Sequence, residues 1–121
     1  MCVVIYDYNK KRQKELSDII YKIYDEKNCD VDIRCFDRKD DVINLTGCEP
    51  VEMAFISMDD TKGDGYFLAD RLKKANSQMN LIAMSDELRY GRELLQMHVS
   101  GYIIGARTRE KVLDELDNLR Y

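Results

Sequence analysis

The chain has 121 residues, of which 45% are hydrophobic and 35% charged, with a formal net charge of −4. These values are typical of one globular domain and exclude a disordered chain. No stretch approaches the ~18 apolar residues that a membrane-spanning helix needs, and the first residues lack the pattern of a secretory signal. We therefore expect a single cytoplasmic domain over residues 1–121 that does not enter a membrane.

The cysteines and the basic residues give little sign of chemistry. The cysteines form no CxxC pair and no metal-binding spacing; they are Cys2, Cys29, Cys35 and Cys48. Without a signal peptide, this spacing predicts reduced, buried thiols and no metal site. The only basic run lies within residues 10–14 and is too narrow for a nucleic-acid surface, so we expect a solvated helix face there.

The first part of the chain predicts two strands separated by a helix. Val3–Ile5 is short and wholly apolar, as in a central buried strand. Asn9 suits the N-cap of the helix that follows. The apolar residues of that helix recur with helical spacing, at Leu16, Ile19, Ile20 and Ile23. Residues 31–35 alternate apolar and polar side chains, which predicts a half-exposed strand near the edge of a sheet.

The rest of the chain continues this alternation. A short helix is predicted from residue 37 to about 45, closed by Gly47, and strands are predicted at 53–56, 81–84 and 102–104. A helix from about residue 66 has Phe67, Leu68 and Leu72 as its expected inner side, and a less regular helix covers 88–97. Thr108 suits the N-cap of the last helix. The inward residues of that helix are Val112, Leu113, Leu116 and Leu119.

Five strands that alternate with five helices predict an α/β fold, in which helices cover both faces of a parallel sheet. The very apolar first strand belongs in the middle of that sheet. For this number of strands the flavodoxin-like order 2-1-3-4-5 is the expected doubly wound solution. A functional site is then expected at the carboxyl ends of the strands, near strands 1 and 3.

The residues at those carboxyl ends define the candidate site. They are Asp7, Tyr8, Ser57, Asp59, Ser85 and Gly105. Around them the chain resembles, nearly end to end, the receiver (CheY-like) domain of bacterial two-component response regulators. The resemblance rests on residues 5–9, on the eight-residue interval from Ser57 to Gly65, and on residues 83–85 and 101–106. Residues 85–87 are similar to receivers that carry LytTR-type DNA-binding domains.

The resemblance also shows where the chain departs from the family. It implies a phosphoacceptor aspartate at position 57, an acidic pair at 7 and 8 that holds Mg²⁺, and a lysine at 105. The chain has Ser57, Tyr8 and Gly105 there, so Asp7 alone remains of the acidic pair. Asp59 matches a position whose backbone carbonyl is a metal ligand in the family.

Two further positions keep the residue type that the resemblance implies. Ser85 and Tyr102 match the hydroxyl that contacts the phosphoryl group in the family and the aromatic residue that follows it inward. Without a phosphoryl group, phosphorylation cannot trigger a change at these two switch positions.

The substitutions predict a degenerate pocket without catalytic residues, cofactor or metal. A serine hydroxyl is a far weaker acid than a carboxyl and needs an activating base, and His98 lies at the end of the fourth predicted helix. A serine phosphate would also be a stable ester, unsuited to a reversible phosphorelay. We therefore predict that Ser57 is not phosphorylated by a histidine kinase. We further hypothesise that Tyr8 packs against Ser57 and hydrogen-bonds to it, which would fix the site in one conformation.

The sequence thus predicts an atypical receiver domain that regulates transcription or signalling through protein contacts. The resemblance implies a working surface on the fourth helix, fifth strand and fifth helix, suited to a homodimer. It includes Arg89, Arg92, Tyr102 and Arg109. DNA binding is expected only through an attached output domain.

Two other classes of function fit an α/β domain of this size less well. The alternative is a flavodoxin-like domain that binds a small regulatory molecule, although the glycine-free segment after the first strand is a poor phosphate cradle. An enzyme is not predicted, because the site offers an acid and two serines but no histidine or lysine.

Overall fold

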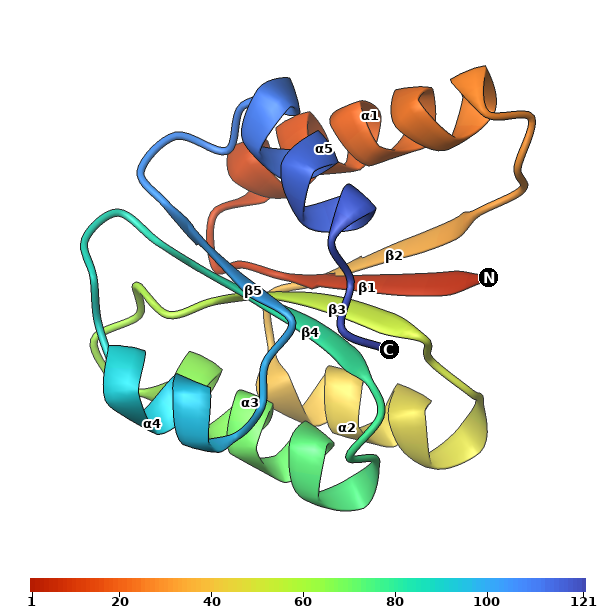
Figure 1. Cartoon of the computed structure of the whole chain (residues 1–121). Coiled ribbons are helices and arrows are strands. Elements are labelled where there is room, and N and C mark those ends of the chain that lie inside the picture. The colour runs from red at the N-terminus through yellow and green to blue at the C-terminus, as the bar shows by residue number, and fades with distance from the viewer.

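Five parallel strands form a twisted sheet at the centre of the molecule, in the order β2-β1-β3-β4-β5 (Figure 1). The computed structural model describes residues 1–121. Its strands are β1 Cys2–Tyr6, β2 Asp32–Phe36, β3 Met53–Ser57, β4 Asn80–Ser85 and β5 Gly101–Ile104. Its helices are α1 Lys10–Glu26, α2 Lys39–Cys48, α3 Asp64–Ala75, α4 Gly91–Gln96 and α5 Arg109–Asp117. The predicted fold class and strand order are confirmed.

Helices cover both faces of the sheet. Figure 1 shows α1 and α5 on one face and α2, α3 and α4 on the other. Each face has its own apolar core because successive side chains of a strand point to opposite sides. On β1, Val3 and Ile5 belong to the core under α1 and α5, whereas Val4 and Tyr6 belong to the other. This two-sided burial explains the wholly apolar sequence of the central strands.

The ends of the helices agree with the sequence at most positions. The Asn9 side chain accepts the backbone N–H of Arg12 at 3.1 Å, and Thr108 accepts that of Lys111 at 3.3 Å, so both predicted N-caps are confirmed. The second helix is longer than predicted and runs through Gly47. The fourth helix begins only at Gly91, because Tyr90 adopts a left-handed conformation with φ 56° and interrupts it.

Two predictions of burial are wrong. Phe67 is 48% exposed, because Leu68, Ala69 and Leu72 form the inner stripe of α3 and position 67 lies outside it. All four cysteines are free, but only Cys2 is buried, since the others lie in exposed positions of the β2 region and the ends of α1 and α2.

Charged side chains lie at both edge strands, on β2 itself and beside β5. On β2, which is half exposed as predicted, Arg34 pairs with Asp32 and Glu49. On β5, Lys111 of α5 donates from Nζ to the Ile104 carbonyl at 2.7 Å. None of the helices is both long and apolar enough to cross a lipid bilayer.

Candidate functional site

Three buried polar residues meet at the carboxyl ends of the central strands. Asp7 follows β1, Ser57 ends β3 and Ser85 ends β4, and each is at most 1% exposed. The parallel register brings the three strand ends to one edge of the sheet, with Tyr6 opposite Ile56 and Ser57 opposite Met84. The predicted site residues on these strands are therefore gathered at one place, at the switch point between β1 and β3.

Ser57 is enclosed by a tight β3–α3 loop. Its Oγ accepts the backbone N–H of Asp59 at 3.3 Å. Gly65, in the first turn of α3, lies so close to β3 that a Cβ there would be 1.9 Å from the Ser57 carbonyl oxygen. Asp60 caps the helix by accepting the N–H groups of Asp64 and Gly65 at 2.7 and 3.1 Å. The eight-residue interval from Ser57 to Gly65 thus reflects a loop whose end admits only glycine.

Tyr8 does not close the site, and the hypothesis of a Tyr8–Ser57 contact is wrong. The Tyr8 side chain is 53% exposed and makes no hydrogen bond to Ser57. The turn after β1 determines this orientation, because Asp7 points inward and accepts the N–H of Asn9 at 2.9 Å. Tyr8 instead lines a shallow surface depression with the acidic residues of the β3–α3 loop.

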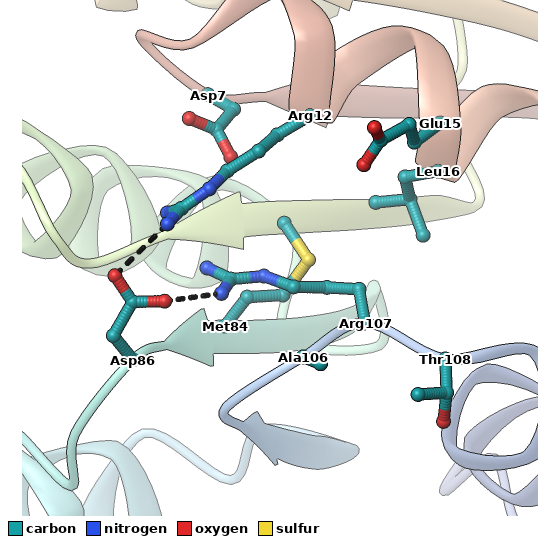
Figure 2. A pocket seen from close by; sticks show the side chains of 9 residues that line it. All are labelled: Asp7, Arg12, Glu15, Leu16, Met84, Asp86, Ala106, Arg107 and Thr108. Carbon is teal, nitrogen blue, oxygen red and sulfur yellow. Dashed lines mark hydrogen bonds and ion pairs between the residues drawn. The ribbon is translucent and has the colours of Figure 1, made fainter.

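An ion-pair network of Arg12, Asp59, Asp86 and Arg107 occupies the outer part of the site. The Asp59 side chain, 7% exposed, accepts from Arg107 Nη2 at 3.0 Å and Arg12 Nη1 at 3.4 Å. It also accepts the Asp86 N–H at 3.0 Å and lies 2.9 Å from Ser85 Oγ. Figure 2 shows that Asp86 bridges the two guanidinium groups, at 2.8 Å from Arg107 Nη1 and 3.0 Å from Arg12 Nη2. Asp59 therefore contributes its side-chain carboxylate to this network, whereas the resemblance assigned a role to its backbone carbonyl.

Little in the sequence indicated this network. Arg12 lies in the basic run that we expected to be solvated, and Lys10, Lys11 and Lys14 are indeed exposed. Arg12 differs because it occupies the first turn of α1 on the side of Leu16, one helical turn later, which faces the sheet. Asp86 follows β4 directly, and Arg107 lies two residues after the expected lysine position.

Burial and the two arginines set the charge state of the acidic residues. Burial raises the pKa of Asp7, and the Asn9 N–H and the positive charges of Arg107 and Arg12 offset only part of this increase. Partial burial alone would raise the pKa of Asp86, but hydrogen bonds from Arg107 and Arg12 outweigh it and lower that pKa. Asp86 is therefore held as a carboxylate, whereas Asp7 keeps its proton to a higher pH than an ordinary aspartate.

Gly105 leaves the expected lysine position without a side chain, but the same loop supplies another cation. Gly105 has φ 81°, a left-handed conformation that favours glycine, and its N–H donates to the Ser85 carbonyl at 2.8 Å. The side chain of Arg107, two residues later, is 9% exposed and reaches Asp59. A positive charge thus lies at the site although the lysine is absent.

The two switch positions both make specific contacts. Ser85 Oγ lies within hydrogen-bond distance of Asp59 Oδ1 and of the Glu87 carbonyl, and its single proton serves one of these acceptors. The Tyr102 hydroxyl accepts the Arg89 N–H at 2.9 Å and donates to the Arg89 carbonyl at 2.7 Å. Tyr102 therefore ties β5 to the loop between β4 and α4.

The positively charged residues of the expected working surface do not all lie together. Arg89 and Arg92 are exposed beside α4. Arg109 pairs instead with Glu26 at the end of α1. It therefore marks the border of that surface on the α1 side.

The acidic residues do not fit the Mg²⁺ site that the resemblance implies. Mg²⁺ prefers free carboxylate oxygens and water in octahedral geometry. Tyr8 replaces one acid, and the Asp59 carboxylate is engaged by two guanidinium groups. No group of three His, Cys, Asp or Glu side chains in residues 1–121 is placed to hold a metal ion.

A cavity of about 320 Å³ lies beside the network, between α1 and the loop after β5. Figure 2 shows the side chains that line it, from α1, the end of β4 and the β5–α5 loop. Within its wall, the Nε atom of Arg107 is buried and has no hydrogen-bond partner.

Comparison with known proteins links this fold to signalling domains. No protein-family model matches the sequence, and no curated protein matches it either. The response regulatory domain of protein mrkE from Klebsiella pneumoniae superposes with a TM-score of 0.82 at 20% identity, over 98% of this chain and 94% of that one. Response regulator TrrA from Thermotoga maritima, solved in complex with Mg²⁺-BeF, gives 0.79 at 9% identity and 96% coverage of both chains. A two-component response regulator from Clostridium difficile gives 0.77 at 16% identity, over 97% and 93%. The chain therefore has the fold of response-regulator receiver domains, as the resemblance in the sequence predicted.

Proposed function

We propose that this chain is an atypical receiver, a cytoplasmic regulatory domain that acts through protein contacts and is not phosphorylated. The observation that carries the proposal is the environment of Asp59. Its carboxylate lies against Ser85 Oγ and forms an ion pair with Arg107 of the β5–α5 loop. These are the two kinds of contact that the resemblance assigns to the phosphoryl group of a working receiver. Asp59 thus serves as an internal substitute for that group.

The energetics of the network favour one fixed state. Asp59 and Arg107 are 7% and 9% exposed, so their charges are poorly solvated and depend on each other. Removal of one partner from a buried ion pair typically costs 3–5 kcal/mol. An incoming Mg²⁺ would have to draw the Asp59 carboxylate away from Arg12 and Arg107, and the loss of this counter-charge from the buried Arg107 would cost an amount of this order. That cost approaches the ~5.5 kcal/mol that moves a two-state equilibrium from 1:99 to 99:1.

Chemistry at position 57 supports the same conclusion. TrrA, a protein of the same fold, was solved with Mg²⁺-BeF. Here the corresponding strand ends in Ser57, whose hydroxyl is 1% exposed and accepts a backbone N–H. No imidazole or amine lies within hydrogen-bond distance of Ser57 Oγ to activate it.

Exposure to a phosphoryl donor tests the proposal. The chain would be incubated with acetyl phosphate and Mg²⁺ and its intact mass measured, with the TrrA receiver treated in parallel as the positive control. We expect no phosphorylated species of this chain. We also expect that beryllofluoride with Mg²⁺ leaves the ¹H–¹⁵N spectrum unchanged. A phosphoryl adduct on any residue, or a beryllofluoride-dependent spectral change around Asp59, would refute the proposal.

The surface on α4, β5 and α5 is the proposed site of protein contact. Three large apolar side chains are exposed there or in the loop before α4: Leu88 at 66%, Leu95 at 76% and Ile104 at 43%. Apolar residues flanked by arginine are typical of protein interfaces. We assign this surface to a protein partner, with a second copy of the chain as the first candidate. Contact with DNA would then require an attached output domain, since the net charge is −4.

A further inference from the structure

The last four residues of the chain cross the amino-terminal ends of the strands. Helix α5 ends at Asp117, and residues 118–121, here called the strap, follow it. Figure 1 shows the chain running from α5, on one face of the sheet, toward the layer of α2 and α3 on the other. The strap ends against Lys73 of α3 and Asn80 at the start of β4. It therefore ties the two helical layers together, at the end of the sheet opposite to the candidate site.

The side-chain amide of Asn80 binds the backbone of Tyr121. Asn80 is 8% exposed, and its Oδ1 accepts the Tyr121 N–H at 2.9 Å, while its Nδ2 lies 3.5 Å from the Tyr121 main-chain oxygen. The same Oδ1 accepts a second hydrogen bond from Ser100 Oγ at 2.8 Å. A carbonyl oxygen has two lone pairs, so one amide serves both donors. Asn80 thus joins the strap to the residue that precedes β5.

The ring of Tyr121 covers a buried ammonium group. Lys73 is 6% exposed, and its Nζ donates to the carbonyls of Ser77 and Met79 at 2.7 and 3.0 Å. No carboxylate pairs with it, and burial together with the positive charge of Arg120 lowers its pKa. The face of the Tyr121 ring, whose centroid lies 4.5 Å from Nζ, supplies negative potential in place of a carboxylate. The strap is therefore part of the environment that this charge needs.

The strap also contacts the turn between α4 and β5, residues 97–100. Arg120 Nη2 donates to His98 Nδ1 at 3.1 Å. His98 has φ 61°, a left-handed conformation that a residue other than glycine keeps only where its surroundings hold it. The N–H groups of Val99 and Ser100 bond back to α4 and β4 at 3.4 and 2.8 Å. The strap thus helps to hold a strained turn at the end of α4.

We propose that the strap is a releasable device that holds the α4–β5 turn, and with it the end of α4, in the form that a protein partner meets. While the strap is docked, Asn80 and Arg120 fix the turn. A molecule that binds the strap more tightly than Asn80 and Lys73 do would shift the domain to a released form with a looser turn. The relevance to a partner rests on the proposed function of the α4–β5–α5 surface, whereas the hold on the turn does not.

Acetylation of lysine side chains measures whether the strap is docked. The 121-residue chain would be treated briefly with acetic anhydride, and the acetylated fractions of Lys73 and Lys74 compared by mass spectrometry. The side chain of Lys74 is 77% exposed and serves as the internal reference. In Tyr121→Ala we expect the ratio of Lys73 to Lys74 acetylation to rise at least about threefold, the factor that a partly exposed cation–π contact provides. Tyr121→Phe should behave like the parent, because docking uses the ring and the backbone of Tyr121.

Amide hydrogen exchange measures the hold on the turn. Tyr121→Ala should speed the exchange of the Val99 and Ser100 N–H groups at least about threefold, because loss of the strap makes local opening easier by that factor. The amides of β1 should exchange as in the parent, since β3 separates β1 from β4. Tyr21→Ala removes a 57% exposed ring from α1 and is the matched control, which should leave the turn unchanged.

Dimerisation separates this inference from the proposed function. In a dimeric chain, Tyr121→Ala should raise the dimer Kd at least about threefold, because a loosened turn must be ordered again on binding. Tyr121→Phe should keep the Kd of the parent. A monomeric parent would contradict the homodimer alone, since the acetylation and exchange measurements use the monomer.

Four results would overturn the inference. The first is a Tyr121→Ala chain whose Lys73 acetylation or turn exchange matches that of the parent. The second is exchange that rises equally in β1, which would indicate a general loss of stability. The third is a Tyr121→Phe chain that behaves like Tyr121→Ala. The last is an unchanged dimer Kd in a Tyr121→Ala chain with a loosened turn.

Discussion

At Asp59, one carboxylate holds together segments that are distant in the chain. It receives guanidinium groups from α1 and from the β5–α5 loop, and it contacts Ser85 and the Asp86 N–H after β4. A charge that is 7% exposed stays favourable only while such partners remain, because each replaces hydration lost on folding. Asp59 is therefore the residue at which the outer site is most sensitive to substitution.

We expect Asp59→Asn to lower the free energy of unfolding by about 2–3 kcal/mol, since Arg107 loses its buried counter-charge and keeps only the more exposed Asp86. Urea unfolding at neutral pH measures this. Asp70→Asn is the matched control, because it removes the exposed i,i+4 pair with Lys74, for which a loss of about 0.3–0.5 kcal/mol is usual. Equal losses in both variants would show that the network does not stabilise the fold.

The buried carboxyl of Asp7 predicts that the stability of the fold depends on pH. Burial raises its pKa in the folded chain above the ordinary value of the unfolded one. The folded state thus binds the proton more tightly, and the stabilisation that this gives at low pH is lost as pH rises through the raised pKa. Asp7→Asn stays neutral and keeps an acceptor for the Asn9 N–H.

Urea unfolding of the Asp7→Asn variant and the parent chain at pH 4, 5, 6 and 7 measures this effect. We expect the variant to gain stability relative to the parent as pH rises. The other titrating groups are the same in both chains, so their effects cancel in the difference between the two free energies of unfolding. A difference that stays constant, or that shrinks toward pH 7, would contradict a raised pKa at Asp7.

Among the elements, the junction of β3 and α3 is the most constrained. The helix begins against the end of the strand, so a methyl group at Gly65 would lie 1.9 Å from the Ser57 carbonyl oxygen. The loop is also fixed by Asp60, which caps α3. Relief of such an overlap requires the helix to move away from the sheet.

We therefore expect Gly65→Ala to destabilise the fold by about 1–3 kcal/mol, the usual cost of overpacking. Gly47→Ala is the matched control, since a Cβ at that position in α2 meets nothing within 4 Å. It should stabilise the chain by about 0.5–1 kcal/mol, because alanine favours a helix interior. Thermal unfolding of both variants checks the opposite signs, and the same sign in both would refute this account.

The segment between β4 and α4 is held by aromatic residues rather than by helix length. The α4 helix has only six residues. Tyr102 binds both backbone polar groups of Arg89, and the rings of Tyr66 and Tyr90 lie 4.7 Å apart. These contacts fix the loop that leads into the proposed protein-binding surface, so that surface is already formed in the free domain.

For the whole molecule, the exposed apolar side chains on the α4–β5–α5 surface predict self-association. We expect the chain to dimerise at high micromolar concentration in light scattering after gel filtration, and Leu95→Asp, which places a charge on a 76% exposed apolar position, to be monomeric. Tyr21→Asp, at a 57% exposed position on α1, is the matched control and should remain dimeric. A monomeric parent chain, or a dimeric Leu95→Asp variant, would contradict the homodimer and leave a different protein as the partner.

The fold was predictable because it depends on local patterns. Apolar strands such as Val3–Ile5 and the helical stripe of α1 follow from periodicities of two and 3.6 residues. The positions of Asp7, Ser57 and Ser85 followed from these elements, because residues after parallel strands meet at one edge of the sheet. Their burial is therefore a consequence of the topology.

The network was not predictable in the same way. Arg12 and Arg107 contact Asp59 across 47 and 48 positions of sequence, and no local pattern encodes such a pairing. The predicted direction of the Tyr8 side chain was wrong because a short turn determines it. In that turn the Asn9 N–H donates to the Asp7 carboxylate. Long-range charge pairing and turn geometry are thus the parts that the sequence left open.

The charged side chains at the two edges of the sheet have a consequence for aggregation. A sheet can grow when another chain pairs with the free N–H and C=O groups of an edge strand. On β5, Lys111 already occupies the Ile104 carbonyl, and the Glu115 carboxylate fills the space above Gly101, where a Cβ would lie 1.6 Å from it. On β2, Arg34 with Asp32 and Glu49 places charges along the opposite margin. Another strand that paired with either edge would meet these charges, so we expect crowded copies of this chain to resist fibrous β-sheet assembly.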